Sequence, residues 1–221
     1  MEKALSAKIK LLAGSIALLI AFTIFIIYLP TITSLLHSSS SQTKVIDSQA
    51  VDKVIGGNWI ENISSSGNAV INGTEAKVTF SNGTSTEIST SQIQTGKISQ
   101  YLQFIDNGLN SISFYSFYQN NSSILQITIL NYSSKSQAES VFELALGAVE
   151  ELQSSNLSIS NFSSSNLSIH VFNITNYKAF VVEGKGFSIA IGENGNQIAT
   201  VFLKPENRTA VESLIKYLIK V

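Results

Sequence analysis

The most strongly apolar stretch of the chain lies near its N-terminus. Residues 11–29 contain no charged side chain, and Lys3, Lys8 and Lys10 precede them. A helix of this length spans roughly 28 Å, which is close to the hydrocarbon thickness of a bilayer. The pattern predicts a transmembrane anchor over 11–29. The positive-inside rule then places residues 1–10 in the cytoplasm and the rest of the chain outside.

Two other interpretations of this stretch stay open. A cleaved signal peptide would have a shorter apolar core, about 7–15 residues, and a small-x-small cleavage site. The sequence after Pro30 shows no clear site of that kind. The basic residues before a long apolar run also resemble a type IV pilin leader, although Leu11 follows Lys10 directly, without the usual small residue. We expect an uncleaved anchor followed by a flexible linker over residues 30–45.

The segment after the linker, residues 46–96, predicts a small β-rich lobe. A short helix over 48–55 is expected to begin after Asp47 as its N-cap and to end at Gly56. Trp59, the single tryptophan, opens a strand and is expected in the core.

A hairpin is predicted later in the same segment. Strands 77–80 and 85–89 flank Asn82 and Gly83, a pair that suits a type I′ turn.

The remaining chain, residues 97–221, predicts an α+β domain. Apolar residues at helix spacing indicate amphipathic helices over 134–153 and 205–221. We expect a mostly antiparallel sheet with both helices on one of its faces. The strands are expected at 111–118, 123–130, 167–174, 178–184, 186–192 and 197–204, with turns at 184–186 and 193–195.

A weak internal repeat joins the two predicted helices. Residues 128–146 align without a gap to residues 201–219, and both segments read as strand, polar turn and amphipathic helix. The alignment indicates either a duplicated unit or two strand–helix units that look alike because they share a pattern.

An uncharged stretch over 154–169 carries three Asn-x-Ser triplets at intervals of five residues. An interval of five would reverse the side-chain direction along one continuous strand. Two strands joined by a turn at 161–164 avoid this reversal. We therefore predict a hairpin with Asn156 and Asn166 on its outer face and Asn161 at its tip.

Composition narrows the class of protein. Charged residues make up 13 % of the 221-residue chain, against roughly 25 % in an average soluble protein, and the formal net charge is −1. Without a basic patch, nucleic acid is not an expected partner. Cysteine is absent and methionine occurs once, so zinc, iron–sulfur, thiol and haem sites lack their usual ligands and no cofactor is expected.

Sequons for N-glycosylation are unusually frequent. Eleven of the eighteen asparagines begin an Asn-x-Ser/Thr triplet, where about four would be expected by chance. All of them follow the predicted anchor, and glycosylation of several would require an exported, exposed position. Asn120 and Asn121 overlap, so only one of the two is expected to carry a glycan. The predicted acceptors are Asn62, Asn72, Asn82, Asn120, Asn121, Asn131, Asn156, Asn161, Asn166, Asn173 and Asn207.

These features together resemble envelope proteins of thermoacidophilic archaea, which are membrane-anchored and glycosylated. The resemblance is one of composition, covers the whole chain and rests on no single motif. At pH 2–3 most carboxylates are protonated, so a surface of neutral polar groups and sugars keeps its solubility. The resemblance implies a location at the cell membrane and partners among membrane or envelope proteins.

Candidate catalytic residues are few. His37 lies in the predicted linker, and His170 lies on a predicted strand, where a lone histidine is usually structural. Glu61, Glu183 and Glu193 are the acids least tied to predicted helices. No nucleophile-elbow, P-loop, dinucleotide-binding or metalloprotease motif occurs. We therefore expect no catalytic residue and no metal site.

The sequence favours a non-catalytic surface glycoprotein that acts by interaction, either as an accessory subunit of a membrane complex or between membrane and surface layer. A membrane-tethered solute-binding domain is the main alternative, and would show a concave apolar pocket. An extracellular hydrolase and a pilin-like filament subunit remain further alternatives. The aromatic residues Phe114, Tyr115, Phe117 and Tyr118 are expected either in the core or at a contact surface.

Overall fold

The computed structural model describes residues 46–73, 75–89, 108–120, 122–154, 158–159, 162–163, 168–174 and 177–219. The predicted anchor, the linker and the predicted boundary near residue 96 lie outside these ranges. Within them, no helix is long and apolar enough to cross a membrane.

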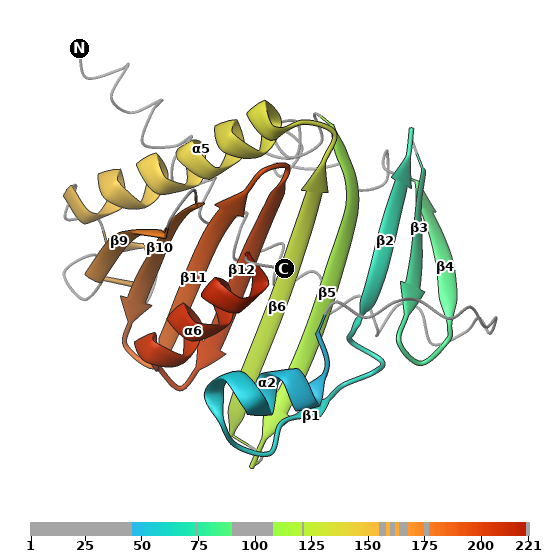
Figure 1. The fold of residues 1–221 in the computed structure, drawn as a ribbon, viewed down its shortest axis with the longest axis horizontal. Helices are drawn as coiled ribbons and strands as arrows, with labels where there is room; N and C mark the ends of the chain where they lie inside the picture. The colour runs from blue at the N-terminus through green and yellow to red at the C-terminus, as the bar shows by residue number, and fades with distance from the viewer. Residues whose placement is uncertain are drawn as a thin grey trace.

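A ten-stranded antiparallel sheet forms the centre of the molecule (Figure 1). Its strand order is β4-β3-β2-β5-β6-β12-β11-β10-β9, and β1 pairs with β5 beside β2. The predicted mostly antiparallel α+β fold is therefore confirmed. The strands are β1 (Ile60–Glu61), β2 (Gly67–Asn72), β3 (Glu75–Phe80), β4 (Ser85–Ser89), β5 (Leu109–Gln119), β6 (Ser123–Tyr132), β9 (Ser168–Ile174), β10 (Tyr177–Gly184), β11 (Phe187–Asn194) and β12 (Gln197–Lys204).

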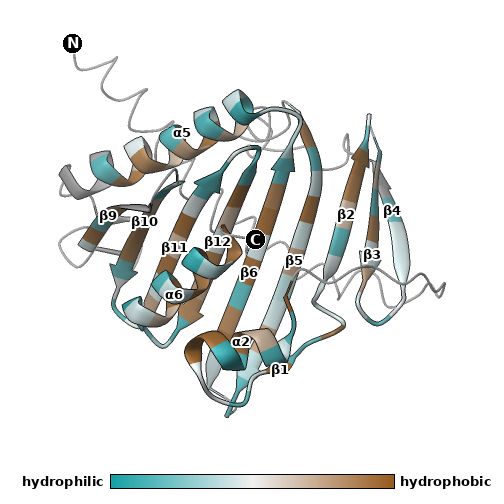
Figure 2. Ribbon diagram, viewed as in Figure 1, coloured by the Kyte–Doolittle hydropathy of each residue, from teal (hydrophilic) through white to brown (hydrophobic). Residues whose placement is uncertain are grey.

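The two faces of this sheet build two separate cores. On the α6 face, defined by Leu125, Ile127 and Ile129 of β6, the side chains pack with α2 (Ser48–Ile55) and α6 (Arg208–Leu218). On the α5 face, defined by Leu130 and Tyr132, they pack with α5 (Lys135–Ser154). Apolar residues accordingly run along the central strands, where helices cover both sides (Figure 2).

The prediction that both long helices share one face is wrong, because α5 and α6 lie on opposite faces of the sheet. The internal repeat pairs Ile129 with Phe202. Ile129 belongs to the α6-face core, whereas Phe202 lies opposite Gln126 and Ile189 and points to the α5 face. An alignment that joins residues from opposite faces describes two similar strand–helix units and not a symmetric duplication.

The predicted helix after the linker is confirmed with its caps. The Asp47 carboxylate accepts a hydrogen bond from the Ala50 amide at 2.8 Å, and Gly56 ends α2 with a φ of 74°. Trp59 is 7 % exposed and lies in the α6-face core, as predicted. Its backbone amide donates to the Asp52 carboxylate at 2.8 Å, which fixes β1 to the end of α2.

The β3–β4 hairpin is confirmed, but its turn differs from the prediction. Thr79 lies opposite Ser85, and the Gly83 amide donates to the Phe80 carbonyl at 3.0 Å. A type I′ turn needs a positive φ at both central residues. Only Gly83 has one here, with a φ of 88°, and the connection is a longer loop.

Both long helices begin at polar caps. The Ser134 hydroxyl accepts from the Gln137 amide at 3.4 Å at the start of α5. Asn207 is the N-cap of α6, and its side-chain oxygen accepts from the Ala210 amide at 3.0 Å. The prediction that Pro205 lies in the first turn of α6 is therefore wrong, because that residue precedes the cap.

The uncharged stretch forms a hairpin, as predicted, with a different turn. β7 (Ser158–Ile159) pairs with β8 (Phe162–Ser163), and Ile159 lies opposite Phe162. The predicted turn at 161–164 is wrong, because Phe162 and Ser163 lie in β8, and Ile169 belongs to β9. Asn156, Asn161 and Asn166 lie outside the described residues.

Candidate functional site

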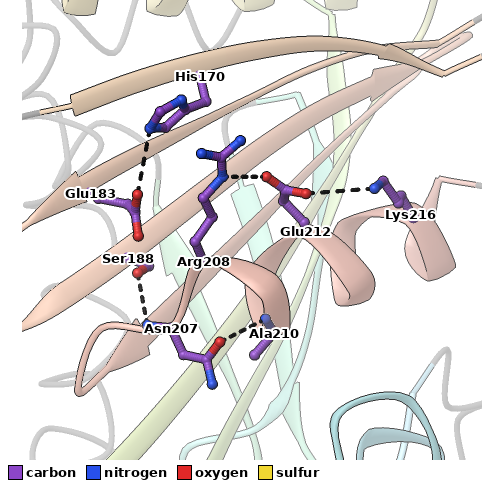
Figure 3. Close-up of polar contacts among 8 residues, drawn as sticks. All are labelled: His170, Glu183, Ser188, Asn207, Arg208, Ala210, Glu212 and Lys216. Carbon is purple, nitrogen blue, oxygen red and sulfur yellow. Dashed lines mark hydrogen bonds and ion pairs between the residues drawn. The ribbon is translucent and has the colours of Figure 1, made fainter.

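His170 and Glu183 come together on the α6 face at the β9–β10 edge. The register places Glu183 opposite Ser168 and Ser188, and His170 Nε2 lies 3.6 Å from Glu183 Oε2 (Figure 3). Ser188 is fully buried, and its hydroxyl accepts a hydrogen bond from the Asn207 amide at 2.9 Å. The order across the strands is histidine, glutamate, serine.

This order does not suit nucleophilic catalysis. In a serine hydrolase the histidine lies between the nucleophile and the acid, so that it can take the hydroxyl proton. Here the carboxylate of Glu183 stands between His170 and Ser188, and the Ser188 hydroxyl supports the start of α6. These three side chains therefore do not form a Ser–His–Glu triad, and the Ser188 contact fits a role in holding α6 to the sheet.

Charged side chains of α6 continue the polar surface next to this row. Glu212 Oε1 lies 2.6 Å from Arg208 Nε, and Glu212 Oε2 lies 3.6 Å from Lys216 Nζ (Figure 3). Burial raises the pKa of the Glu212 carboxyl, but the hydrogen bond and charge of Arg208, with the charge of Lys216, outweigh it and lower the pKa overall. Lys216 Nζ also lies 5.2 Å from the ring centre of Phe172. These charges are partnered within the protein.

A shallow depression lies where β9 begins and β10 ends. Its volume is about 510 Å³, and it is lined by Ser168, Glu183, Gly184 and Lys185. Small-molecule sites are usually enclosed and mostly apolar, with a few polar groups that fix orientation. This depression is open and lined by polar and charged residues, so it offers little support for a solute-binding domain.

A second set of ionisable side chains lies under α5. Glu193 is 4 % exposed, and its Oε1 atom has no hydrogen-bond partner among the described atoms. Burial raises the pKa of the Glu193 carboxyl, and the negative charge of Glu139 raises it further, while Lys135 and Lys178 act in the opposite direction. Glu143, which is paired with Lys178, also raises it. The prediction that residue 193 begins a turn is wrong, because Glu193 lies in β11 and the turn is at 195–196.

Among the described residues, no group of three or more acidic, histidine or cysteine side chains is arranged to hold a metal ion. Glu61 lies in β1 opposite Phe117 of β5. The strands β6 and β12 separate β5 from β11, which holds Glu193, and β9 with His170 lies further along the sheet. His37 lies outside the described residues.

Glu193→Gln is expected to stabilise the protein at neutral pH and to have little effect at acid pH. A carboxyl whose pKa is raised by folding stabilises the fold below its unfolded pKa, here the ordinary value of 4.5, and this contribution is lost as pH rises through the folded pKa. Glutamine keeps the shape without the buried charge. Urea unfolding of the full-length chain in mild detergent, followed by Trp59 fluorescence at pH 3 and pH 7, measures the difference.

Glu87→Gln is the matched control, because Glu87 is exposed on β4. That variant should follow the wild-type pH profile of unfolding. If Glu193→Gln also follows the wild type at both pH values, Glu193 does not carry an unfavourable buried charge.

The sequon asparagines cluster at exposed turns and element ends. Six of the eleven have side chains in the described part of the chain, and all but Asn131 are exposed. Asn131 is half-buried. Its side-chain nitrogen donates to the Ser111 hydroxyl at 3.0 Å, and its side-chain oxygen accepts from the side-chain nitrogen of Gln197 at 2.8 Å. Asn121 lies outside the described residues, as does the side chain of Asn173 in β9. The exposed sequon asparagines are Asn62, Asn72, Asn82, Asn120 and Asn207.

The aromatic run in β5 divides between core and surface. Tyr115 and Phe117 are buried on the α6 face and Phe114 on the α5 face, whereas Tyr118 is 43 % exposed. Sequence alternation could not identify Tyr118 as the exposed member, because apolar residues cover both faces of this strand.

No protein-family model matches this sequence, and no curated protein matches it. Among solved structures, the extracellular domain of PknH from Mycobacterium tuberculosis is similar, with a TM-score of 0.44 and 9 % sequence identity. The match covers 79 % of this chain and 90 % of that domain. A likeness at this level says nothing about what this chain binds or does.

Proposed function

We propose that the chain is a single-pass membrane-anchored surface glycoprotein whose outer domain acts by interaction and not by catalysis. The role is that of an accessory subunit of a membrane complex, or of a component between membrane and surface layer. The charge-free stretch 11–29 supports the anchor. The paired charges on α6 and the position of Glu183 between His170 and Ser188 support a non-catalytic role.

The observation that carries the proposal is the exposure of the sequon asparagines. A glycan is bulky and soluble, so its acceptor must face solvent. Asn72, Asn82 and Asn120 lie at turns between strands, Asn62 directly follows β1, and Asn207 caps α6. At Asn207 the capping bond uses the side-chain oxygen, and the amide nitrogen that would carry the glycan points away from the helix (Figure 3).

Thr209→Ala is expected to remove one glycan mass from the protein purified from its native source. The substitution destroys the sequon of Asn207 and keeps the asparagine as the N-cap of α6, so the fold should be unaffected. Intact-mass analysis of the detergent-solubilised full-length chain measures both the glycan loss and whether residue 1 is retained.

Ser133→Ala is the comparison, because it destroys the sequon of the half-buried Asn131; it also removes the hydrogen bonds that the Ser133 hydroxyl donates to the Gly108 carbonyl and the Asn110 side chain. We expect a smaller change in mass there, since the Asn131 amide is bound between Ser111 and Gln197. A wild-type mass equal to the bare 221-residue chain would refute the glycoprotein, and cleavage near residue 40 would refute the retained anchor. Co-purification of envelope proteins with the wild-type chain tests the interaction role.

A further inference from the structure

Exposed apolar side chains gather where β5 turns into β6. Ile60 of β1 lies opposite Tyr118 of β5, and Tyr118 lies opposite Ile124 of β6, so the three stand side by side on the α5 face. They are 53 %, 43 % and 41 % exposed. Ile63, just after β1, is 48 % exposed. We call these four residues the hairpin-end patch.

The patch lies beyond the reach of α5. That helix starts close to the opposite end of β6, after Tyr132, and packs on β6, β9, β11 and β12. Lys204 lies opposite Ile124 on the next strand and is also exposed. An aliphatic and aromatic surface bordered by lysine, with no described helix over it, marks a contact surface.

The same end of the sheet is where the chain enters the domain. Residue 46 is the first described residue, and α2 lies across the end of the sheet where β5 and β6 are joined (Figure 1). A Cβ added to Gly57, just after α2, would lie 2.5 Å from Gln119 Nε2 beside the β5–β6 turn. The predicted linker over 30–45 would have a mean end-to-end distance of about 22 Å if flexible. A linker of that length, attached at residue 46, would keep this end of the domain within reach of the bilayer.

We propose that the hairpin-end patch docks onto the lipid surface of the membrane that holds the anchor. The proposal rests on the proposed function. Tyrosine places its ring in the headgroup region and its hydroxyl in water, and lysine reaches from an apolar surface to the polar layer. Tethering supplies a high effective concentration, so a contact too weak for free association suffices. Four side chains are few for a stable protein interface, which buries about 800 Å² per partner.

The absence of cysteine from the chain allows an unambiguous test. Full-length Ile124→Cys and Val70→Cys, each labelled with a fluorescent probe, are reconstituted in phosphatidylcholine vesicles that contain a lipid-attached nitroxide quencher. Val70 is the matched control because it is 49 % exposed and lies on the α6 face, opposite Ser111 near the other end of β5. Docking predicts stronger quenching of the label at 124 than of the label at 70.

The added changes Ile60→Ser and Tyr118→Ser should reduce the quenching at 124 to the level at 70. Both positions are exposed, so the fold should tolerate serine there. Equal quenching at 124 and 70 in protein that resists carbonate extraction would overturn docking and leave the anchor intact. Extraction of the wild-type chain by carbonate would overturn the anchor itself. Shielding of position 124 in native envelopes, but not in vesicles, would assign the patch to a protein partner and overturn the lipid contact.

Discussion

Phe180→Ala is expected to lower the free energy of unfolding by about 3–5 kcal/mol. The Phe180 side chain is 0 % exposed, and its ring packs edge-on against Phe142 of α5, with 5.4 Å between ring centres. Truncation would leave a cavity between helix and sheet that the surrounding strands can fill only in part. Urea unfolding of the full-length chain in mild detergent, followed by Trp59 fluorescence, gives the change.

Val171→Ala is the matched control for this substitution. Val171 lies directly opposite Phe180 on β9 and points to the same face, but it is 54 % exposed. Its truncation should change the free energy of unfolding by no more than about 0.5 kcal/mol. If both variants lost a similar free energy of unfolding, α5 could not lie over β10 as described, and another segment would have to bury Val171.

Local patterns in the sequence predicted most of the elements, because each depends on residues close together in the chain. The helix that follows Asp47, the strands β5 and β6 and the four strands before α6 all appear close to where the sequence pattern placed them. Turn details were less predictable. The type I′ turn at Asn82 and the position of residue 193 both failed, since a short loop and a two-residue turn can be built from the same glycine-containing sequence.

The placement of the helices could not be predicted, because it depends on which face of the sheet each helix covers. In β10, four consecutive residues, Ala179 to Val182, are buried, so alternation does not distinguish an inner from an outer face. All four are buried because α6 covers one face of the strand and α5 covers the other. An apolar run of this kind in an antiparallel sheet indicates that both faces of the strand are packed, but it does not say which helix covers which face.

The candidate site depends on cross-strand register, which the sequence specifies only indirectly. The pairing of Ile174 with Tyr177 sets the register of β9 against β10. This register places His170 and Glu183 on the same face, close enough for their side chains to meet. Ser168, His170 and Phe172 share one face of β9, as alternation along any strand requires, but the sequence does not reveal which strand is the partner. The burial of Glu193 had no sequence signal at all, because α5, which covers it, is distant along the chain.

Gly67→Ala is expected to destabilise the protein by about 3 kcal/mol, at the upper end for an added methyl group in a packed interior. A Cβ at this position would lie 2.3 Å from the Thr79 carbonyl oxygen and 2.8 Å from the Phe80 Cα. These are backbone atoms of the neighbouring strand and cannot rotate away. The strands cannot separate easily either, because the Ser81 amide donates to the Ser66 carbonyl at 2.8 Å beside the contact.

Gly147→Ala provides the control with the opposite expected sign. Gly147 is exposed within α5, and a Cβ there would meet nothing within 4 Å. Alanine in an exposed helix interior is favoured over glycine by about 1 kcal/mol, so this variant should be more stable than the wild type. The same chemical change therefore separates the two environments: the added methyl group is opposed by strand backbone at Gly67 and favoured by lower chain entropy at Gly147. A gain in stability for Gly67→Ala would show that β2 and β3 are not paired as closely as this register requires.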